Sequence, residues 1–332
     1  MQRCIVLFLT LALLLCACAA TEITPTTGET NAPTNGTEGP TVPEMNIHPD
    51  REKCTVPTEN VEGDYIYKVI GSRQLRIIYR PALVNVYEKA PVLFLISGGG
   101  FMECSEEWAI DYMANEAMKL RQSGFAVVSV EYRVGGEGVN IKQVYSDMAD
   151  AMRYLSYYSD VFGIDPNKFV TSGHSAGGSA SLALAYVDHD VFDVDGYWPE
   201  ADYQVVGAYS LSGHGDYTKT DFGPYGGYCS ENARTNKGLF PTEEMRREVS
   251  PVFYLDGSKI PCKLLMGEMD NVVAPVFVEK FKEACDAAGV PCDVVWFENA
   301  GHTYESMNGE DVWPRYSVQK AKIVDFAKSC VE

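Results

Sequence analysis

The feature that most constrains the fold is a glycine-flanked serine between an apolar run and a stretch of small residues. Residues 169–178 read FVTSGHSAGG, so Ser175 lies at the centre of a G-x-S-x-G pattern. Small residues are required two positions before and after such a serine, because the chain turns sharply there and lifts the hydroxyl above a sheet. Residues 176–186 continue with mostly small, helix-compatible residues. We therefore predict a strand, a tight turn and a helix, with Ser175 as a candidate nucleophile.

Apolar runs alternate with helical patterns from residue 59 to the end of the chain. This alternation predicts one α/β domain over residues 59–332, with a mostly parallel central sheet and helices on both faces. Strands are predicted at 64–69, 75–79, 91–96, 125–132, 168–171, 205–211, 262–266 and 294–297. Helices are predicted at 106–122, 143–158, 176–186, 274–288 and 317–331.

The first residues have the pattern of an export signal. An apolar run at 5–15 follows a basic residue and is too short to span a bilayer. Residues 15–18 read LCAC, which resembles the lipobox of bacterial lipoproteins. That resemblance implies a signal peptide at 1–17 and a lipidated Cys18 as the mature N-terminus, on the extracytoplasmic side of the cell membrane. The alternative is an ordinary secretory signal cut after Ala19 or Ala20, which would give a secreted protein.

Residues 18–58 are predicted to be a tether. Between residues 21 and 43, 15 of 23 residues are Thr, Pro or Gly. Such a composition contains too few apolar side chains to form a packed core. The predicted organisation is therefore a signal peptide at 1–17, a tether at 18–58 and a single α/β domain at 59–332.

The charge of the chain restricts its partners. The sequence has 27 basic and 46 acidic residues, a formal net charge of −19. A strongly acidic protein has no general attraction for phosphate backbones, so no nucleic-acid partner is expected. No run of about 18 apolar residues is present, so contact with a membrane is expected through the lipid anchor only.

A glycine run follows the predicted strand at 91–96. Residues 97–101 read SGGGF, and bare glycines let backbone N–H groups approach a substrate oxygen closely. The N–H groups of Gly99, Gly100 and Ala176 are therefore candidates for an oxyanion hole. The alternatives are a turn without a ligand or a phosphate cradle, and the latter lacks the Lys-Ser/Thr ending of a P-loop.

A serine hydroxyl needs a base to take its proton and a third group to orient that base. Of the five histidines, His302 lies in a loop after the last predicted strand, the best position for the base. Asp270 follows the strand at 262–266 and is the preferred orienting acid, with Glu268 as the alternative. The structural alternatives are a loop histidine without a catalytic role and an N-cap role for Asp270 at the helix from 274.

Taken together, these motifs resemble the α/β-hydrolase fold family. The order Ser175, Asp270, His302 agrees with the order of that family. Within it, the glycine run, GHSAGG at 173–178 and GEMDNVV at 267–273 resemble the carboxylesterase group that includes hormone-sensitive-lipase-like and feruloyl or acetylxylan esterase-like members. That group usually has a histidine before its glycine run, where this chain has Ser97, so the anchoring of the glycine loop differs.

The resemblance implies a serine carboxylesterase that hydrolyses short-chain or aromatic acyl esters, with plant polysaccharide fragments as one implied carrier of the ester. It implies no metal and no cofactor. Activity is expected to fall at acid pH as His302 becomes protonated. Two alternatives stay open: a serine peptidase on the same fold, and a catalytically inactive binding lipoprotein.

Two further features are undecided from sequence. Residues 212–249 form a long, partly aromatic connection, either a lid over the pocket or a set of satellite loops. Seven cysteines follow Cys18 without any C-x-x-C pair, so a zinc site is not expected. Cys262 and Cys292 begin two strands that we expect to be neighbours, which makes them a candidate disulfide pair.

Overall fold

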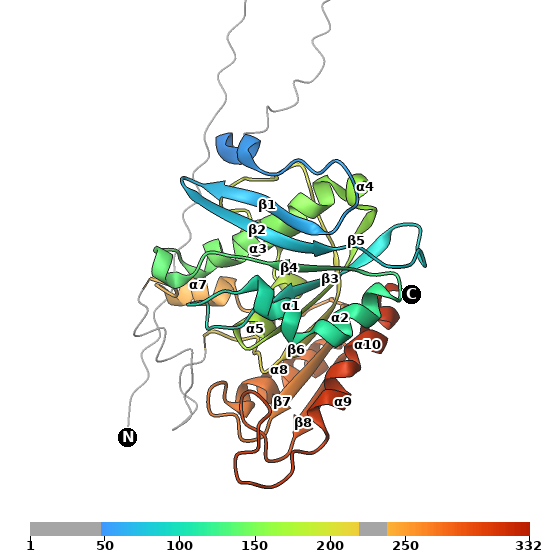
Figure 1. The fold of residues 1–332 in the computed structure, drawn as a ribbon. Coiled ribbons are helices and arrows are strands. Elements are labelled where there is room, and N and C mark those ends of the chain that lie inside the picture. Colours follow the sequence, from blue (N-terminus) through green and yellow to red (C-terminus); the bar gives the residue numbers. More distant parts are fainter. Residues whose placement is uncertain (1–47, 219–237) are drawn as a thin grey trace, which may run out of the picture. The chain divides into compact units, whose positions relative to one another are not determined.

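The computed structural model describes residues 48–218 and 238–332 (Figure 1). The predicted signal peptide, Cys18 and most of the predicted tether lie outside the described residues, as does the middle of the 212–249 connection. Among the helices of the described part, none has the length and apolarity needed to cross a membrane.

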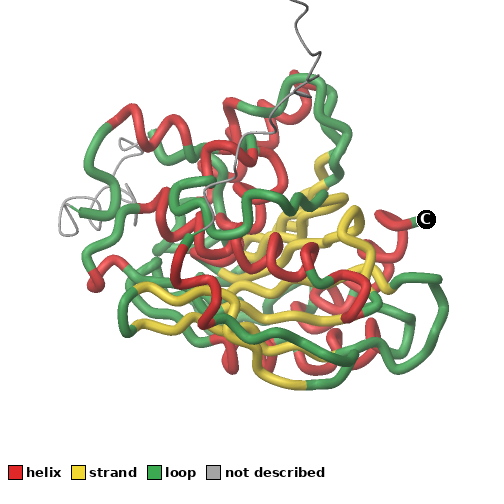
Figure 2. Tube along the Cα trace, turned by 90° about the horizontal axis from the view of Figure 1, so that it is seen from above, coloured by secondary structure: helices red, strands yellow, loops and turns green. Residues whose placement is uncertain are grey.

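An eight-stranded sheet forms the centre of the domain, and its strands are yellow in Figure 2. The order of the strands is β1-β2-β4-β3-β5-β6-β7-β8. The first two strands run antiparallel to their neighbours, and the strands from β4 to β8 are all parallel. This confirms the predicted α/β class. The strands are β1 (Gly63–Ile70), β2 (Arg73–Arg80), β3 (Ala90–Ile96), β4 (Ala126–Val130), β5 (Ile164–His174), β6 (Val205–Leu211), β7 (Cys262–Gly267) and β8 (Cys292–Phe297).

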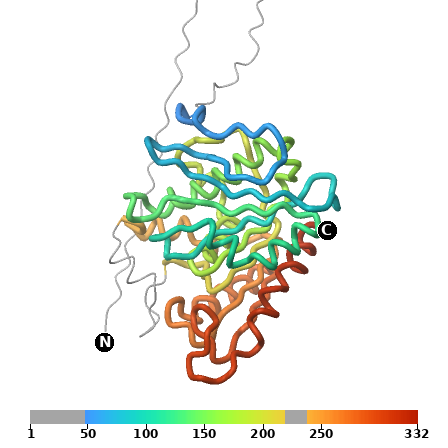
Figure 3. The backbone as a smooth tube through the Cα atoms, viewed as in Figure 1, coloured from blue at the N-terminus to red at the C-terminus, as the bar shows by residue number. Residues whose placement is uncertain are grey.

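Helices cover both faces of this sheet. The α-helices are α1 (Glu106–Tyr112), α2 (Ala114–Arg121), α3 (Ile141–Tyr157), α4 (Ser159–Phe162), α5 (Ala176–Tyr186), α7 (Glu243–Glu248), α8 (Pro275–Ala288), α9 (Tyr316–Ala321) and α10 (Ile323–Val331). Short 3-10 helices are η1 (Pro49–Lys53), η2 (Gly135–Glu137), η3 (His189–Phe192) and η5 (Pro251–Phe253). The chain ends in α10, which lies beside α2 (Figure 3).

The alternation of side chains along the strands divides the core into two layers. In β3, Val92, Phe94 and Ile96 pack into the layer that contains α3, α5 and α8. Leu93 and Leu95 point the other way, into the layer with α1, α2 and α10. A parallel strand covered by helices on both sides needs apolar residues at every position, which is why residues 91–96 read as an uninterrupted apolar run.

Two predicted helices are each split in two. The helix predicted at 106–122 is interrupted at Met113, where the backbone has φ −105° and ψ 15°. The helix predicted at 317–331 is interrupted at Lys322. The side chain of Met113 is buried in the core, so the apolar pattern continues through the break and conceals it in the sequence.

The packed domain begins before residue 59, contrary to the predicted tether boundary. Residues 49–53 form η1, and the side chain of Cys54 is buried. The Arg51 guanidinium lies 4.0 Å from the centroid of the Trp198 ring and also pairs with Glu200. These contacts join residues far apart in the chain, so the local composition on which the tether prediction relied did not reveal them.

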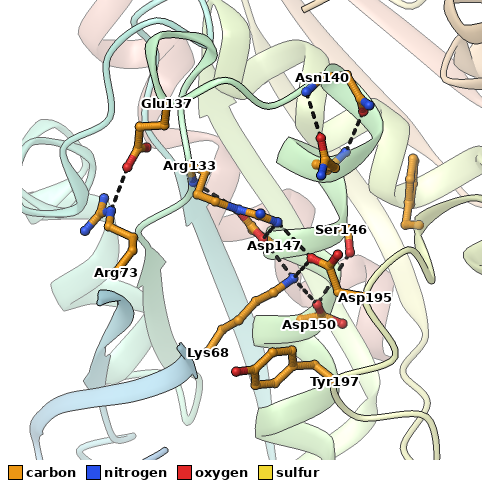
Figure 4. Close-up of polar contacts among 12 residues, drawn as sticks. Lys68, Arg73, Arg133, Glu137, Asn140, Ser146, Asp147, Asp150, Asp195 and Tyr197 are labelled. Atoms are coloured by element: carbon orange, nitrogen blue, oxygen red, sulfur yellow. Dashed lines mark hydrogen bonds and ion pairs between the residues drawn. The ribbon is translucent and has the colours of Figure 1, made fainter. Parts of the chain in front are cut away.

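A cluster of buried charges ties β1 to α3 (Figure 4). The Lys68 ammonium lies 2.9 Å from Asp147, 2.6 Å from Asp150 and 2.7 Å from Asp195. Arg133 adds bidentate bonds to Asp147 at 2.8 and 2.7 Å. Burial alone would lower the pKa of Lys68, but the three carboxylates raise it above its usual value, so the lysine is charged.

Candidate active site

Ser175 lies at the sharp turn between β5 and α5, as predicted. Its backbone has φ 58° and ψ −118°, a left-handed conformation that is rare for a residue with a side chain. A Cβ atom at Gly173 would meet the backbone of Gly177 at 2.5 Å, and one at Gly177 would meet the Ile96 carbonyl oxygen at 2.2 Å. The two glycines therefore allow the close approach of β3, β5 and α5 that holds the strained serine in place.

The structure brings Ser175, His302 and Asp270 together. The Ser175 hydroxyl lies 2.9 Å from Nε2 of His302, and Nδ1 of His302 lies 2.7 Å from a carboxylate oxygen of Asp270. These are hydrogen-bond distances along one continuous chain of groups. The arrangement can move a proton from the hydroxyl to the imidazole while the carboxylate holds the ring.

Asp270 is held in place by its own turn. It is 2% exposed, and one of its carboxylate oxygens accepts hydrogen bonds from the backbone N–H groups of Val272 and Val273, at 2.8 and 2.9 Å. The other oxygen is thereby left for His302. Glu268, the alternative acid, is exposed. The N-cap of α8 is Ala274, so Asp270 does not cap that helix.

The backbone of His302 is anchored by two side chains. Nε2 of His174 and the hydroxyl of Ser212 both donate to the His302 carbonyl oxygen, each at 3.0 Å. Ser212 directly follows β6 and has φ 49°. This role could not be predicted for either residue, because the partner is a backbone oxygen that no side-chain pattern reveals.

Because two histidines next to the site are buried, we predict that the protein becomes less stable as the pH is lowered. Burial lowers the pKa of His174 to about 4 and that of His214 to about 4. In the unfolded chain the usual histidine pKa is about 6.5, so between these values the unfolded state binds more protons than the folded state. The contribution of these two histidines to the free energy of unfolding is therefore fully present above about pH 6.5 and is lost as the pH falls towards 4. The loss is up to about 3 kcal/mol per histidine.

Urea denaturation at a series of pH values tests this prediction. Carboxylates also contribute to acid unfolding, so the informative quantity is the difference between variants. His174→Gln, whose amide can still donate to His302, should show a shallower pH dependence than the wild type. Equal slopes for His174→Gln and the wild type would contradict the assignment.

A pocket with apolar walls opens beside the Ser175 hydroxyl. Gly100 and Ala176 line it, which places two of the three predicted oxyanion donors next to the serine. Gly99 has φ 106° in the same loop, and its carbonyl accepts from Met102 and Glu103, but it is not part of this lining. The remaining walls are Phe101, Ser179, His214, Tyr217, Leu239, Phe240 and Val273.

Ser97 fixes the glycine loop in place of the histidine that the resembled group usually has. The Ser97 hydroxyl accepts from the backbone N–H of Ser105 at 3.2 Å and donates to the Cys104 sulfur at 3.5 Å. The Tyr132 hydroxyl donates to the Ser97 carbonyl at 3.0 Å, from the segment after β4. One residue on, Arg133 joins this segment to the buried charge cluster, so the loop rests on the domain core (Figure 4).

The central part of the chain matches a known protein family. The sequence model of the BD-FAE family matches residues 78–284, more than half of the chain. The chain belongs to the BD-FAE family. The matched region of this BD-FAE member includes Ser175 and Asp270 and ends before the loop that carries His302.

Individual relatives of this BD-FAE protein are distant. It is 23% identical over 245 residues to the probable carboxylic ester hydrolase LipM of Mycobacterium tuberculosis, covering 72% of this chain and 56% of LipM. It is 25% identical over 235 residues to the probable isoprenylcysteine alpha-carbonyl methylesterase ICMEL2 of Arabidopsis thaliana, covering 64% of this chain and 51% of ICMEL2. The chain thus spans about half the length of these two curated relatives.

Among solved structures, the propionate-bound esterase Est2 of Thermogutta terrifontis resembles the BD-FAE chain with a TM-score of 0.65 and 21% sequence identity. The match covers 81% of this chain and 94% of Est2. This likeness shows the α/β-hydrolase fold.

Proposed function

We propose that this protein is a serine carboxylesterase that hydrolyses esters of short acyl groups. The observation that carries the proposal is the continuous hydrogen-bonded chain from the Ser175 hydroxyl through His302 to Asp270, with distances of 2.9 and 2.7 Å. Membership of the BD-FAE family and the esterase relatives support the same chemistry. An inactive binding protein would have no use for the strained backbone at Ser175.

In the proposed mechanism, Nε2 of His302 takes the hydroxyl proton while the Ser175 oxygen attacks the ester carbonyl carbon. The N–H groups of Gly100 and Ala176, with Gly99 as a third donor, bind the oxyanion. His302 then gives its proton to the leaving alcohol as the carbon–oxygen bond breaks. A water molecule loses a proton to His302 and attacks the carbonyl carbon of the acyl-enzyme. The bond to the Ser175 oxygen then breaks, this oxygen takes the proton back from His302, and the acid is released. Asp270 holds the ring of His302 through its hydrogen bond to Nδ1 and stabilises the imidazolium.

The size of the pocket favours short acyl groups over aromatic ones. The free space beside Ser175 is close to that of a single water molecule, and the walls are mostly apolar. A long or aromatic acyl chain would have to displace Phe240 or Leu239, which are buried in the core. We propose acetyl to butyryl esters as the substrate class, carried on an alcohol such as a polysaccharide fragment. Acetyl esters should be cleaved fastest, because the acetyl methyl group is the one that fits this space without displacing a wall.

A substrate panel tests both parts of this proposal. We expect kcat/KM for aryl acetate and butyrate to exceed that for aryl octanoate by about tenfold or more, because each methylene that a pocket cannot hold costs that much. Acetylated xylo-oligosaccharides, feruloylated sugars and a peptide anilide complete the panel. Faster cleavage of feruloyl esters than of acetyl esters would overturn the acyl assignment, and preferential cleavage of the anilide would indicate the peptidase alternative.

We also propose that the protein is attached to the cell membrane through a lipid on Cys18. The support is the LCAC sequence at 15–18 and the Thr-, Pro- and Gly-rich stretch that follows. Cys18→Ser should release the protein from the membrane fraction or stop its maturation, and radiolabelled fatty acid should be incorporated into the wild type only. A wild-type protein found in the medium with an N-terminus after Ala19 or Ala20 would establish the secreted alternative.

A further inference from the structure

Three cysteines from different elements meet at one end of the sheet. Cys262 is the first residue of β7, Cys285 lies in the last turn of α8, and Cys292 is the first residue of β8. Their sulfur atoms all lie within 4.8 Å of one another, and all three are free thiols. Cys285 follows Cys262 by 23 residues and Cys292 follows Cys285 by 7, so the three do not form a C-x-x-C pair and the sequence did not predict this cluster.

The topology explains why these thiols converge. Cys262 and Cys292 are directly paired in the parallel ladder between β7 and β8, so their side chains point to the same face. The helix that connects the two strands, α8, packs on that face and directs Cys285 towards them. The expectation that Cys262 and Cys292 begin neighbouring strands is thus confirmed, and the third sulfur is the unexpected element.

The spacing of the sulfurs suits a metal ion of the thiolate-binding class. Zinc–sulfur bonds of about 2.3 Å place tetrahedral ligands about 3.8 Å apart, so closing the cluster on an ion requires movements of an ångström or less. Cys262 and Cys285 are buried and Cys292 is half-buried, which leaves an approach for an ion from solvent. Soft thiolate ligands select ions such as Zn²⁺ and Cu⁺ over Mg²⁺ or Ca²⁺.

We propose that Cys262, Cys285 and Cys292 bind one thiophilic d10 cation as three thiolates. Within residues 48–218 and 238–332 no carboxylate or imidazole completes the group. The three sulfurs would therefore hold Cu⁺ with three ligands, or Zn²⁺ with a solvent molecule in the fourth position. Binding releases the thiol protons, so the affinity rises with pH.

The position of the cluster indicates what a bound ion would do. Cys262 and Cys292 start the two strands after which Asp270 and His302 follow, so the cluster lies at the opposite end of β7 and β8 from the active site. An ion there would join β7, α8 and β8 without touching the substrate. It should raise the melting temperature and leave kcat unchanged.

Metal titration of the reduced full-length protein tests the proposal. Cd²⁺, added under anaerobic conditions, should give a thiolate-to-metal charge-transfer band that saturates at one ion per chain. Parallel titrations with Zn²⁺, by elemental analysis after desalting, and with Cu⁺ distinguish the two coordination modes. Cys285→Ser should weaken Cd²⁺ binding by about 100-fold or more, since even the loss of an outer-shell partner costs 10- to 100-fold.

Cys330→Ser is the matched control, because Cys330 is a half-buried free cysteine on α10, outside the cluster. It should bind Cd²⁺ as the wild type does. Labelling of Ser175 by a fluorophosphonate shows that each variant is folded, independently of metal binding. Three results would overturn the proposal: no charge-transfer band in the reduced wild type, unchanged binding in Cys285→Ser, or a disulfide among the three cysteines in protein isolated from its host.

Discussion

Ser175→Ala is expected to lower kcat for a short-chain aryl ester by about 10⁵- to 10⁶-fold, the scale seen when a catalytic serine is removed from a triad. The alanine has no oxygen to attack the carbonyl, while Gly100, Ala176 and the pocket walls remain to bind substrate. The loss should therefore appear in kcat, and covalent labelling by a fluorophosphonate should disappear. Steady-state kinetics and mass spectrometry of the labelled protein provide the measurements.

Ser172→Ala is the matched control for this variant. Ser172 lies on the same strand, and its buried hydroxyl donates to the Tyr209 carbonyl at 2.8 Å, away from the imidazole. It should retain activity within a few-fold and should still be labelled. Removal of a triad member leaves far less than about 1% of wild-type turnover. If Ser175→Ala kept more than that, the nucleophile would have to be another group.

Lys68→Met is expected to lower the free energy of unfolding by about 3–5 kcal/mol, because it leaves buried carboxylates without their central cation. Lys68 is fully buried and within ion-pair distance of Asp147, Asp150 and Asp195. Arg133 and Arg153 remain, but they cannot replace the ammonium in contact with all three carboxylates. Chemical denaturation of the purified variant measures the change.

Lys89→Met provides the comparison, since Lys89 makes a single exposed ion pair with Asp160. Such pairs contribute little, so its unfolding midpoint should stay close to that of the wild type. A Lys68→Met protein as stable as Lys89→Met would show that the buried cluster is not needed for stability. Fluorophosphonate labelling of Ser175 in the folded fraction of Lys68→Met would show whether the glycine loop is still held in place. This distinguishes a loss of stability from a loss of support for that loop.

The sequence was sufficient for those features that depend on local pattern. The serine turn requires Gly173 and Gly177 for steric reasons, and the uninterrupted apolar run at 91–96 requires a strand covered on both faces. The chain order of Ser175, Asp270 and His302 was informative because loops after parallel strands meet at one edge of a sheet. Contact between Ser175 and His302 was therefore expected once the parallel sheet had been predicted.

Features that depend on contacts between distant residues were missed. The buried ion pairs of Lys68 join it to residues on α3 and in the loop after η3. From the sequence alone, charged residues are expected to be exposed to solvent, so these pairs were not predicted. The packing of Arg51 on Trp198 was hidden because composition describes only neighbours in the chain. The cysteine cluster was missed for the same reason, since its ligands come from two strands and the helix between them.

The two hydrogen bonds that hold the His302 carbonyl have a consequence for the energetics of turnover. Because the donors come from the ends of β5 and β6, the imidazole is oriented by the rigid frame and not by the arriving ester. The entropy lost in fixing the base is thus incurred once, when the chain folds, and is not repeated in each catalytic cycle. This is preorganisation achieved through a backbone oxygen.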